Sequence, residues 1–157
     1  MIRKISSRID NKILEEIVEI HHRCVLMTNS KYYNSKQIGE WISVINTQSI
    51  KSQIAKSLWI VMENYGKIVG FAQYSLKDEV LYQIQIDPNE QKKGYGKMLY
   101  KYIENDFRES NISNISLFAT LNAISFYKDL GFNIIKEKLF KLTDMEIKMV
   151  EMSKKLD

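Results

Sequence analysis

The segment Gln91-Lys92-Lys93-Gly94-Tyr95-Gly96 has the residue types and spacing most suited to chemistry. It lies between an apolar, strand-like run at 80–86 and a helical pattern at 97–109. A glycine loop that opens a helix can bind phosphate, because free backbone N–H groups point at the ligand and the helix dipole favours negative charge. Gly94 and Gly96 also lack the Cβ atoms that would keep a pyrophosphate away from the backbone. The segment therefore predicts a site for a phosphorylated ligand.

Two common phosphate-binding patterns do not fit this loop. A Walker loop has the form Gly-x-x-x-x-Gly-Lys-[Ser/Thr], but here Gln91 replaces the first glycine and Met98 replaces the hydroxyl residue. A dinucleotide fingerprint has the form Gly-x-Gly-x-x-Gly near the start of a βαβ unit. Leu99 occupies the position of its third glycine, and the unit would have to begin in the middle of the chain.

A third pattern fits every position of the loop. Its form, Gln-x-x-Gly-x-Gly, resembles the acyl-CoA pyrophosphate loop of the GCN5-related N-acetyltransferase (GNAT) superfamily. The resemblance continues with an apolar strand ending in Asp87-Pro88, a helix, a strand and then Asn122. Residues 122–132 are similar to the superfamily's Asn-x-x-Ala-x-x-Phe-Tyr-x-x-x-Gly-Phe segment, with the alanine one or two places early. The likeness covers roughly residues 58–140.

Hydrophobic periodicity predicts the elements that position these residues. Strands are expected at 2–5, 58–62, 68–74, 80–86, 112–118, 133–140 and 145–153, and helices at 10–25, 35–45, 97–109 and 123–130. Asp10, Ser35 and Asn122 are candidate N-caps. The order β-α-α-β-β-β-α-β-α-β-β is that of a GNAT domain. The resemblance implies an α/β (α+β) fold with a twisted mixed sheet of six to seven strands and about four flanking helices.

The resemblance implies acetyl-CoA as acyl-donor cosubstrate. The residues implied to hold it are Gln91, Lys92, Lys93, Gly94, Tyr95, Gly96, Lys97, Asn122 and Phe126. It also implies that the backbone of Ile84 and Ile86 pairs with the pantetheine amides as an added strand would. A buried strand without a ligand fits these two isoleucines about as well, and Asn122 is equally suited to capping the next helix.

The resemblance implies that Tyr127 is the general acid in direct transfer of an acetyl group to a primary amine. A tyrosine, with a pKa of about 10 against about 8.5 for a thiol, can protonate the departing thiolate without being charged at neutral pH. The same residue lies on an apolar stripe with Phe126 and Leu130, which is typical of a core position.

The general base stays open. Many relatives carry a glutamate on the strand before the loop, but Val80 stands at that position here. Glu79, a water chain, or an amine that arrives already neutral are the alternatives. Gln83 and Gln85 cannot act as bases.

Residues on the first two helices are candidates for the acceptor side. In a GNAT fold both helices border the acceptor pocket, so His21 is a candidate proton shuttle, although a hydrogen-bonded core histidine is the commoner situation. Tyr32, Tyr33 and Trp41 are candidates for the pocket wall, with core packing as the alternative for Trp41.

Composition limits the remaining possibilities. A chain of 157 residues is expected to form one domain, and the resemblance implies that residues 1–157 are a single N-acetyltransferase domain. No apolar run approaches the length of a membrane span and no signal pattern is present, so we expect neither a membrane segment nor export. A single cysteine, Cys24, suits a reducing cytoplasm. With two histidines, His21 and His22, no metal-binding cluster is expected.

The net charge of +4 is partly concentrated in lysines around the loop, where a polyanionic cosubstrate would contact them. A nucleic-acid site would use a basic stripe interleaved with aromatic residues, but solvated lysines and a rim for the cosubstrate are the preferred interpretation, so no nucleic-acid partner is expected. The resemblance makes a homodimer through the C-terminal strands an option. Three functions stay in competition: acetylation of a small amine, acetylation of a protein N-terminus or lysine, and acyl-CoA binding without turnover.

Overall fold

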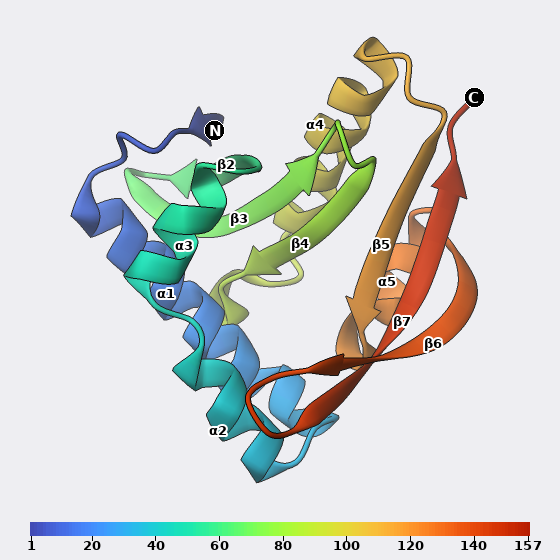
Figure 1. The fold of residues 1–157 in the computed structure, drawn as a ribbon. Coiled ribbons are helices and arrows are strands. Elements are labelled where there is room, and N and C mark those ends of the chain that lie inside the picture. The colour runs from blue at the N-terminus through green and yellow to red at the C-terminus, as the bar shows by residue number, and fades with distance from the viewer.

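The computed structural model describes residues 1–157 and consists of a seven-stranded mixed sheet with helices on both faces (Figure 1). The strands are β1 (Ile2–Ile5), β2 (Leu58–Asn64), β3 (Lys67–Ser75), β4 (Val80–Ile86), β5 (Asn114–Thr120), β6 (Asn133–Lys141) and β7 (Glu146–Lys155), in the spatial order β1-β2-β3-β4-β5-β7-β6. The α-helices are α1 (Asn11–Met27), α2 (Ser35–Ser43), α3 (Thr47–Ile54), α4 (Tyr95–Glu109) and α5 (Ile124–Asp129). The expected fold class is confirmed.

The helix α3 is an addition to the expected order. The Asn46 side chain caps it by accepting a hydrogen bond from the Ser49 N–H, and its buried face consists of Ile50 and Ile54. Two apolar residues four positions apart form too short a stripe to predict a helix.

Two of the proposed N-caps are wrong. Asn34, and not Ser35, caps α2 through a capping box, in which the Asn34 and Gln37 side chains each accept from the other residue's backbone N–H. Asn122 is not the cap of α5, because that helix starts at Ile124, Ala123 is the cap position, and Asn122 lies in a preceding 3₁₀ turn.

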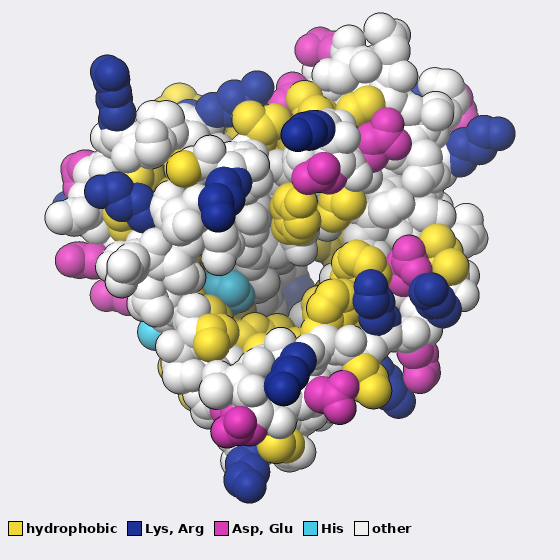
Figure 2. Space-filling model, in the orientation of Figure 1, with side chains coloured by type: hydrophobic (Ala, Val, Ile, Leu, Met, Phe, Trp, Pro, Cys, Tyr) yellow, Lys and Arg dark blue, Asp and Glu magenta, His cyan; other side chains and the backbone are white.

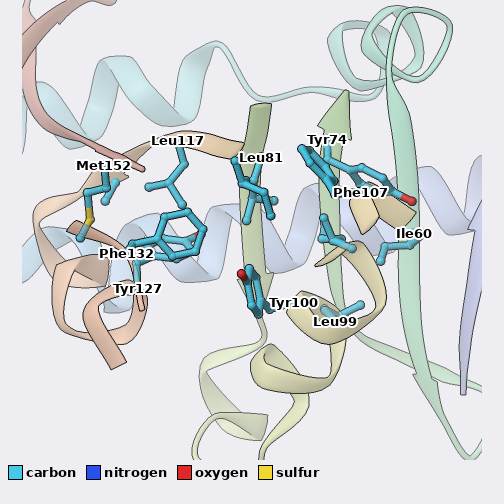
Figure 3. Close-up of a cluster of buried hydrophobic side chains, with 14 of the residues drawn as sticks. Ile60, Tyr74, Leu81, Leu99, Tyr100, Phe107, Leu117, Tyr127, Phe132 and Met152 are labelled. Atoms are coloured by element: carbon cyan, nitrogen blue, oxygen red, sulfur yellow. The ribbon is translucent and has the colours of Figure 1, made fainter. Parts of the chain in front are cut away.

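Two hydrophobic clusters cover the two faces of the sheet. One cluster packs α4 and α5 against the strands and contains Leu99, Tyr100, Ile103, Phe107 and Tyr127 (Figure 3). The other packs α1, α2 and α3 on the opposite face around Trp59 and Phe71. None of the helices is both long and apolar enough to cross a lipid bilayer.

The sheet opens between β4 and β5, its parallel neighbours. They pair only at Val80↔Ser116 and Leu81↔Leu117, near the start of β4, whereas β5 pairs with β7 along its whole length. Beyond Leu81 the two strands diverge, as Figure 1 shows. The carboxyl half of β4 therefore has an edge that no strand covers.

A β-bulge in β4 determines which residues face which side. The register against β3 passes from Gln73↔Gln83 to Tyr74↔Leu81, so Tyr82 is an extra residue that reverses the alternation. As a result Ile84 and Ile86 pack toward the α4 and α5 side of the sheet. Gln83 and Gln85 take the opposite face.

Candidate active site

A cleft of about 370 Å³ occupies the opening between β4 and β5. It brings together almost all of the residues predicted from the sequence. Those that line it are Ile84, Ile86, Gln91, Lys92, Gly94, Tyr95, Gly96, Lys97, Asn122, Phe126 and Tyr127. Lining residues that sequence reasoning did not propose for the site include Cys24, Thr28 and Asn29 at the end of α1, and Gln85.

The loop at the base of the cleft leaves backbone donors free. Gly94 lies in the left-handed region with φ 87° at the N-cap position of α4, and no side chain caps this helix. The first N–H of α4 that bonds within the helix is that of Met98, to the Gly94 carbonyl, and the N–H groups of residues 95–97 have no backbone partner. These donors at a helix N-terminus suit an anion.

Gly96 has a packing role in addition to the one expected. A Cβ atom at this position would lie 3.2 Å from Cζ of Phe126 and 3.7 Å from Cγ1 of Ile86. The absence of a side chain therefore lets the first turn of α4 approach α5 and β4 closely. At Gly94, by contrast, a Cβ would meet nothing within 4 Å, and only the backbone conformation restricts substitution.

The uncovered edge of β4 presents backbone hydrogen-bonding groups to the cleft. Because the Asp87 N–H bonds the Val69 carbonyl of β3, alternation directs the N–H and C=O groups of Ile84 and Ile86 away from β3. The Ile86 carbonyl accepts hydrogen bonds from Cys24 Sγ and Gln91 Nε2, both at 3.1 Å. An extended ligand with amide groups could pair with the groups of this edge that stay free.

An ion pair fixes the end of β4. Arg23 Nη2 of α1 lies 2.7 Å from Oδ2 of the buried Asp87. Burial by itself would raise the pKa of Asp87, but hydrogen bonds from Arg23 and from the Asn89 N–H outweigh it and hold the pKa below its usual value. The carboxylate is therefore charged at neutral pH and anchors the strand where the loop begins.

Cys24 donates a hydrogen bond, and its surroundings keep the thiol protonated. Burial raises the pKa of its thiol to about 12, and Asp87 acts in the same direction. Since the thiolate is the reactive form, a covalent acyl-cysteine step is not expected here.

Tyr127 is buried, and its ring packs edge-on against Phe126 and Phe132 at centroid distances of 5.1 and 5.7 Å. Burial raises the pKa of its hydroxyl above that of ordinary tyrosine, so the phenol stays neutral. It lines the cleft, where an uncharged O–H donor is available to a ligand.

Asn122 has an unpaired acceptor atom among the residues that line the cleft. Its Oδ1 atom is buried and has no hydrogen-bond partner. Leaving a buried acceptor unpaired costs about 1–3 kcal/mol, so such an atom calls for a specific explanation. A donor on a bound molecule would satisfy it.

Two of the predicted site residues are not brought to the cleft. Glu79 is exposed in the turn before β4, roughly 16 Å along an extended strand from Ile84. Lys93 is exposed and pairs with Glu90 at 2.6 Å. Lys92 and Lys97 are the basic residues at the cleft.

A second cavity of about 180 Å³ lies among α1, α2, α3 and β4. Its lining residues are His21, Trp41, Val44, Ile45, Ser49, Ile50, Gln53, Gln83 and Leu142. The hollow in the middle of Figure 2 likewise has a histidine and hydrophobic side chains on its walls.

Of the three aromatic residues expected at the pocket wall, Trp41 lines this cavity and the two tyrosines do not. Tyr33 has a structural role, because its hydroxyl donates to the Lys148 carbonyl and accepts from the Leu121 N–H. Tyr32 is exposed.

His21 makes the stability of the fold depend on pH. Burial, with a contribution from His22, lowers the pKa of His21 from 6.5 to about 4. Between these values the unfolded chain binds a proton that the folded chain does not, so stability falls as the pH drops from 6.5 toward 4. Between pH 7 and pH 5, the free energy of unfolding should fall by about 2 kcal/mol less in a His21→Gln variant than in the wild type. Urea unfolding at the two pH values measures both changes. Equal losses would contradict this account of His21.

Known proteins resemble this chain in both sequence and fold. Residues 29–156 match the family model described as the acetyltransferase (GNAT) domain. An uncharacterized N-acetyltransferase of Pyropia yezoensis is 33% identical over 94 residues, which are 58% of this chain and 51% of that protein. The chain spans about half the length of the first curated relatives it matches.

Two solved structures have the same fold. A GCN5-related N-acetyltransferase from Rhodopseudomonas palustris superposes with a TM-score of 0.90 at 15% identity, over 99% of this chain and 95% of that one. The PaiA N-acetyltransferase of Thermoplasma acidophilum, solved in complex with coenzyme A, gives a TM-score of 0.79 at 20% identity, over 99% and 98% of the two chains.

Proposed function

The chain belongs to the GNAT acetyltransferase family, and from this premise we propose that it is an enzyme that transfers an acetyl group from acetyl-CoA to a primary amine. The observation that supports this most strongly is the cleft between β4 and β5. It combines a free helix N-terminus, an uncovered strand edge and the neutral hydroxyl of Tyr127 in one space.

The chemistry of the lining residues suits each part of acetyl-CoA. The free N–H groups of residues 95–97, with Lys92 and Lys97, suit the pyrophosphate. The edge of β4 at Ile84 and Ile86 suits the amides of pantetheine, and Oδ1 of Asn122 could accept from one of their N–H groups. When bound, this cosubstrate supplies a thioester carbonyl that an amine can attack directly.

Tyr127 is proposed to assist the departure of the thiol. As the C–S bond breaks, negative charge develops on sulfur, and a neutral phenol can hydrogen-bond that charge and deliver a proton. The surplus proton of the attacking amine goes to solvent, from which the phenol is restored. Glu79 is not part of this proposal because of its place outside the cleft, so the amine is proposed to react in its neutral form.

The raised pKa of Tyr127 leads to a prediction for the pH profile. Since the phenol stays protonated through the alkaline range, kcat/KM should rise with pH as the amine loses its proton. No fall should set in below about pH 10. Initial rates of thiol release between pH 6 and 10 test this. A decline above pH 8 that disappears in Tyr127→Phe would contradict it.

Binding without turnover is the alternative. Calorimetric titration with acetyl-CoA, followed by a thiol-release assay with a panel of amines and peptides, separates the possibilities. Binding together with acetylated products supports the proposed enzyme. Binding without product from any acceptor would favour a sensor or scaffold, and no binding would overturn both.

A further inference from the structure

A row of hydrogen-bonded neutral side chains runs across β4 and β3, which we call the glutamine chain. Gln85 Nε2 donates to Gln83 Oε1 at 3.2 Å, and Gln83 Nε2 donates to Gln73 Oε1 at 2.9 Å. Gln73 Nε2 in turn donates to Ser57 Oγ at 3.1 Å. One end of the chain lies at the cleft, where Gln85 is a lining residue, while Gln83 lines the second cavity.

The far end of the glutamine chain fixes its direction. The Ser57 hydroxyl donates its hydrogen to the Gln53 carbonyl at 2.8 Å, and the same oxygen accepts from Trp59 Nε1, which is only a donor. The remaining site on Ser57 is therefore an acceptor, so Gln73 must turn its amide nitrogen toward it. Each following glutamine is oriented in the same sense, because a flipped amide would set two donors or two acceptors against each other.

This direction leaves an oxygen at the cleft. Oε1 of Gln85 is the end of the chain and has no partner in the protein, although it is not among the fully buried unpaired atoms. A neutral amide oxygen can accept an N–H of an incoming amine and so orient its lone pair. Unlike a carboxylate, it does not favour the protonated, unreactive form of the amine.

The second cavity indicates what the amine carries. None of its lining residues is an aspartate, glutamate, lysine or arginine. Its volume of about 180 Å³ exceeds the about 150 Å³ of an apolar protein cavity that binds benzene. His21 and Trp41 supply aromatic surface, and Gln83 places the cavity one step along the same face of β4 from Gln85. An uncharged ring fits it, and a second ammonium group would have no counter-charge.

We propose that the acceptor is a small primary amine with an uncharged, ring-sized apolar group, which sits in the second cavity while Oε1 of Gln85 accepts an amine N–H. This inference rests on the proposed acetyl transfer. In the reaction the amine nitrogen bonds to the carbonyl carbon and the C–S bond breaks. The thiol leaves with a proton from Tyr127, and the amine's surplus proton returns to Tyr127 through solvent.

The test compares 2-phenylethylamine with 1,4-diaminobutane and an alanine-initiated peptide in the thiol-release assay. We expect kcat/KM to be at least about tenfold higher for the aryl amine than for the other two acceptors. Gln85→Leu should lower kcat/KM for the aryl amine by about 10- to 100-fold, as the loss of one hydrogen bond to the acceptor implies. Gln48→Leu is the matched control, since Gln48 is exposed on α3 and lines neither cavity. Preference for the diamine or the peptide, or an unchanged rate in Gln85→Leu, would overturn the proposal.

A binding measurement keeps this inference separate from the catalytic one. Fluorine NMR of 4-fluorophenylethylamine added to the CoA-saturated protein should show line broadening, which is retained in Gln48→Leu. It should be lost in Val44→Trp, because Val44 lines the second cavity from an exposed position and the larger side chain would fill it. Binding without thiol release would support the acceptor site and count against catalysis. An absence of broadening would reject the acceptor site whatever the enzymatic result.

Discussion

A Gly94→Asp variant is expected to lose at least about 100-fold in affinity for CoA and acetyl-CoA while keeping its fold. A Cβ atom at this position meets no atoms within 4 Å, so a clash at Cβ is not the cause, and the strain of the left-handed backbone is common to every side chain placed here. A carboxylate about 4 Å from a phosphate charge is repelled by about 1 kcal/mol in water and about 4 kcal/mol near a protein surface. It would also occupy the helix N-terminus, where free N–H groups are proposed to hold the pyrophosphate. Titration calorimetry measures the loss.

Gly94→Asn separates charge from backbone strain in this experiment. Asparagine has nearly the same shape as aspartate and tolerates the left-handed conformation that φ 87° requires. We expect its affinity to stay within about tenfold of the wild type, because only a modest backbone cost remains. If the Asp and Asn variants have the same affinity for CoA and acetyl-CoA, the added charge has no effect and the loop does not hold the pyrophosphate.

The parts of the site that could be predicted are those in which chemistry and position are local. Gly94 and Gly96 stand two positions apart at the start of one helix, and the access that glycine gives a ligand to the backbone is a local property of that loop. Tyr127 follows Asn122 by five residues, so one short segment positions both. The structure brings all four to a single cleft.

The parts that could not be predicted depend on contacts between distant segments. The Cys24 thiol bonds the Ile86 carbonyl across 62 positions, and no periodicity on α1 indicates this. The bulge at Tyr82 exchanges the faces of the residues that follow it, so alternation counted from Val80 places Gln83 and Gln85 on the wrong side of β4. The direction of the glutamine chain depends on Ser57, which lies two strands away.

Glu79 illustrates the limit of reasoning from a neighbouring position. It is adjacent to the place where relatives carry a glutamate, but it belongs to the turn, with φ 56°, and its backbone carbonyl accepts from the Ser116 N–H. The turn therefore holds its backbone at the closed end of the β4–β5 pair, whereas the cleft opens at the other end.

A Tyr127→Phe variant is expected to lower kcat by about 10² to 10⁴, the usual cost of removing a general acid. Affinity for acetyl-CoA should change little, because the ring contacts with Phe126 and Phe132 are kept and only a hydroxyl is removed. Calorimetric titration measures the affinity for acetyl-CoA, and initial rates of thiol release on the same preparation measure kcat. A loss of affinity matching the loss of rate would indicate a binding role for the hydroxyl instead.

Tyr100→Phe is the matched control for this variant. Tyr100 is buried in the same cluster and packs against the same Phe132, but its hydroxyl donates to Glu104 at 2.9 Å and it does not line the cleft. Loss of the Tyr100 hydroxyl should reduce the free energy of unfolding by about 0.5–3 kcal/mol and leave kcat near the wild-type value. This range runs from a typical net hydrogen bond to a hydrogen bond made to a charged group. If the kcat of Tyr127→Phe is also near the wild-type value, Tyr127 is only a core residue. The thiolate must then leave without a proton from Tyr127.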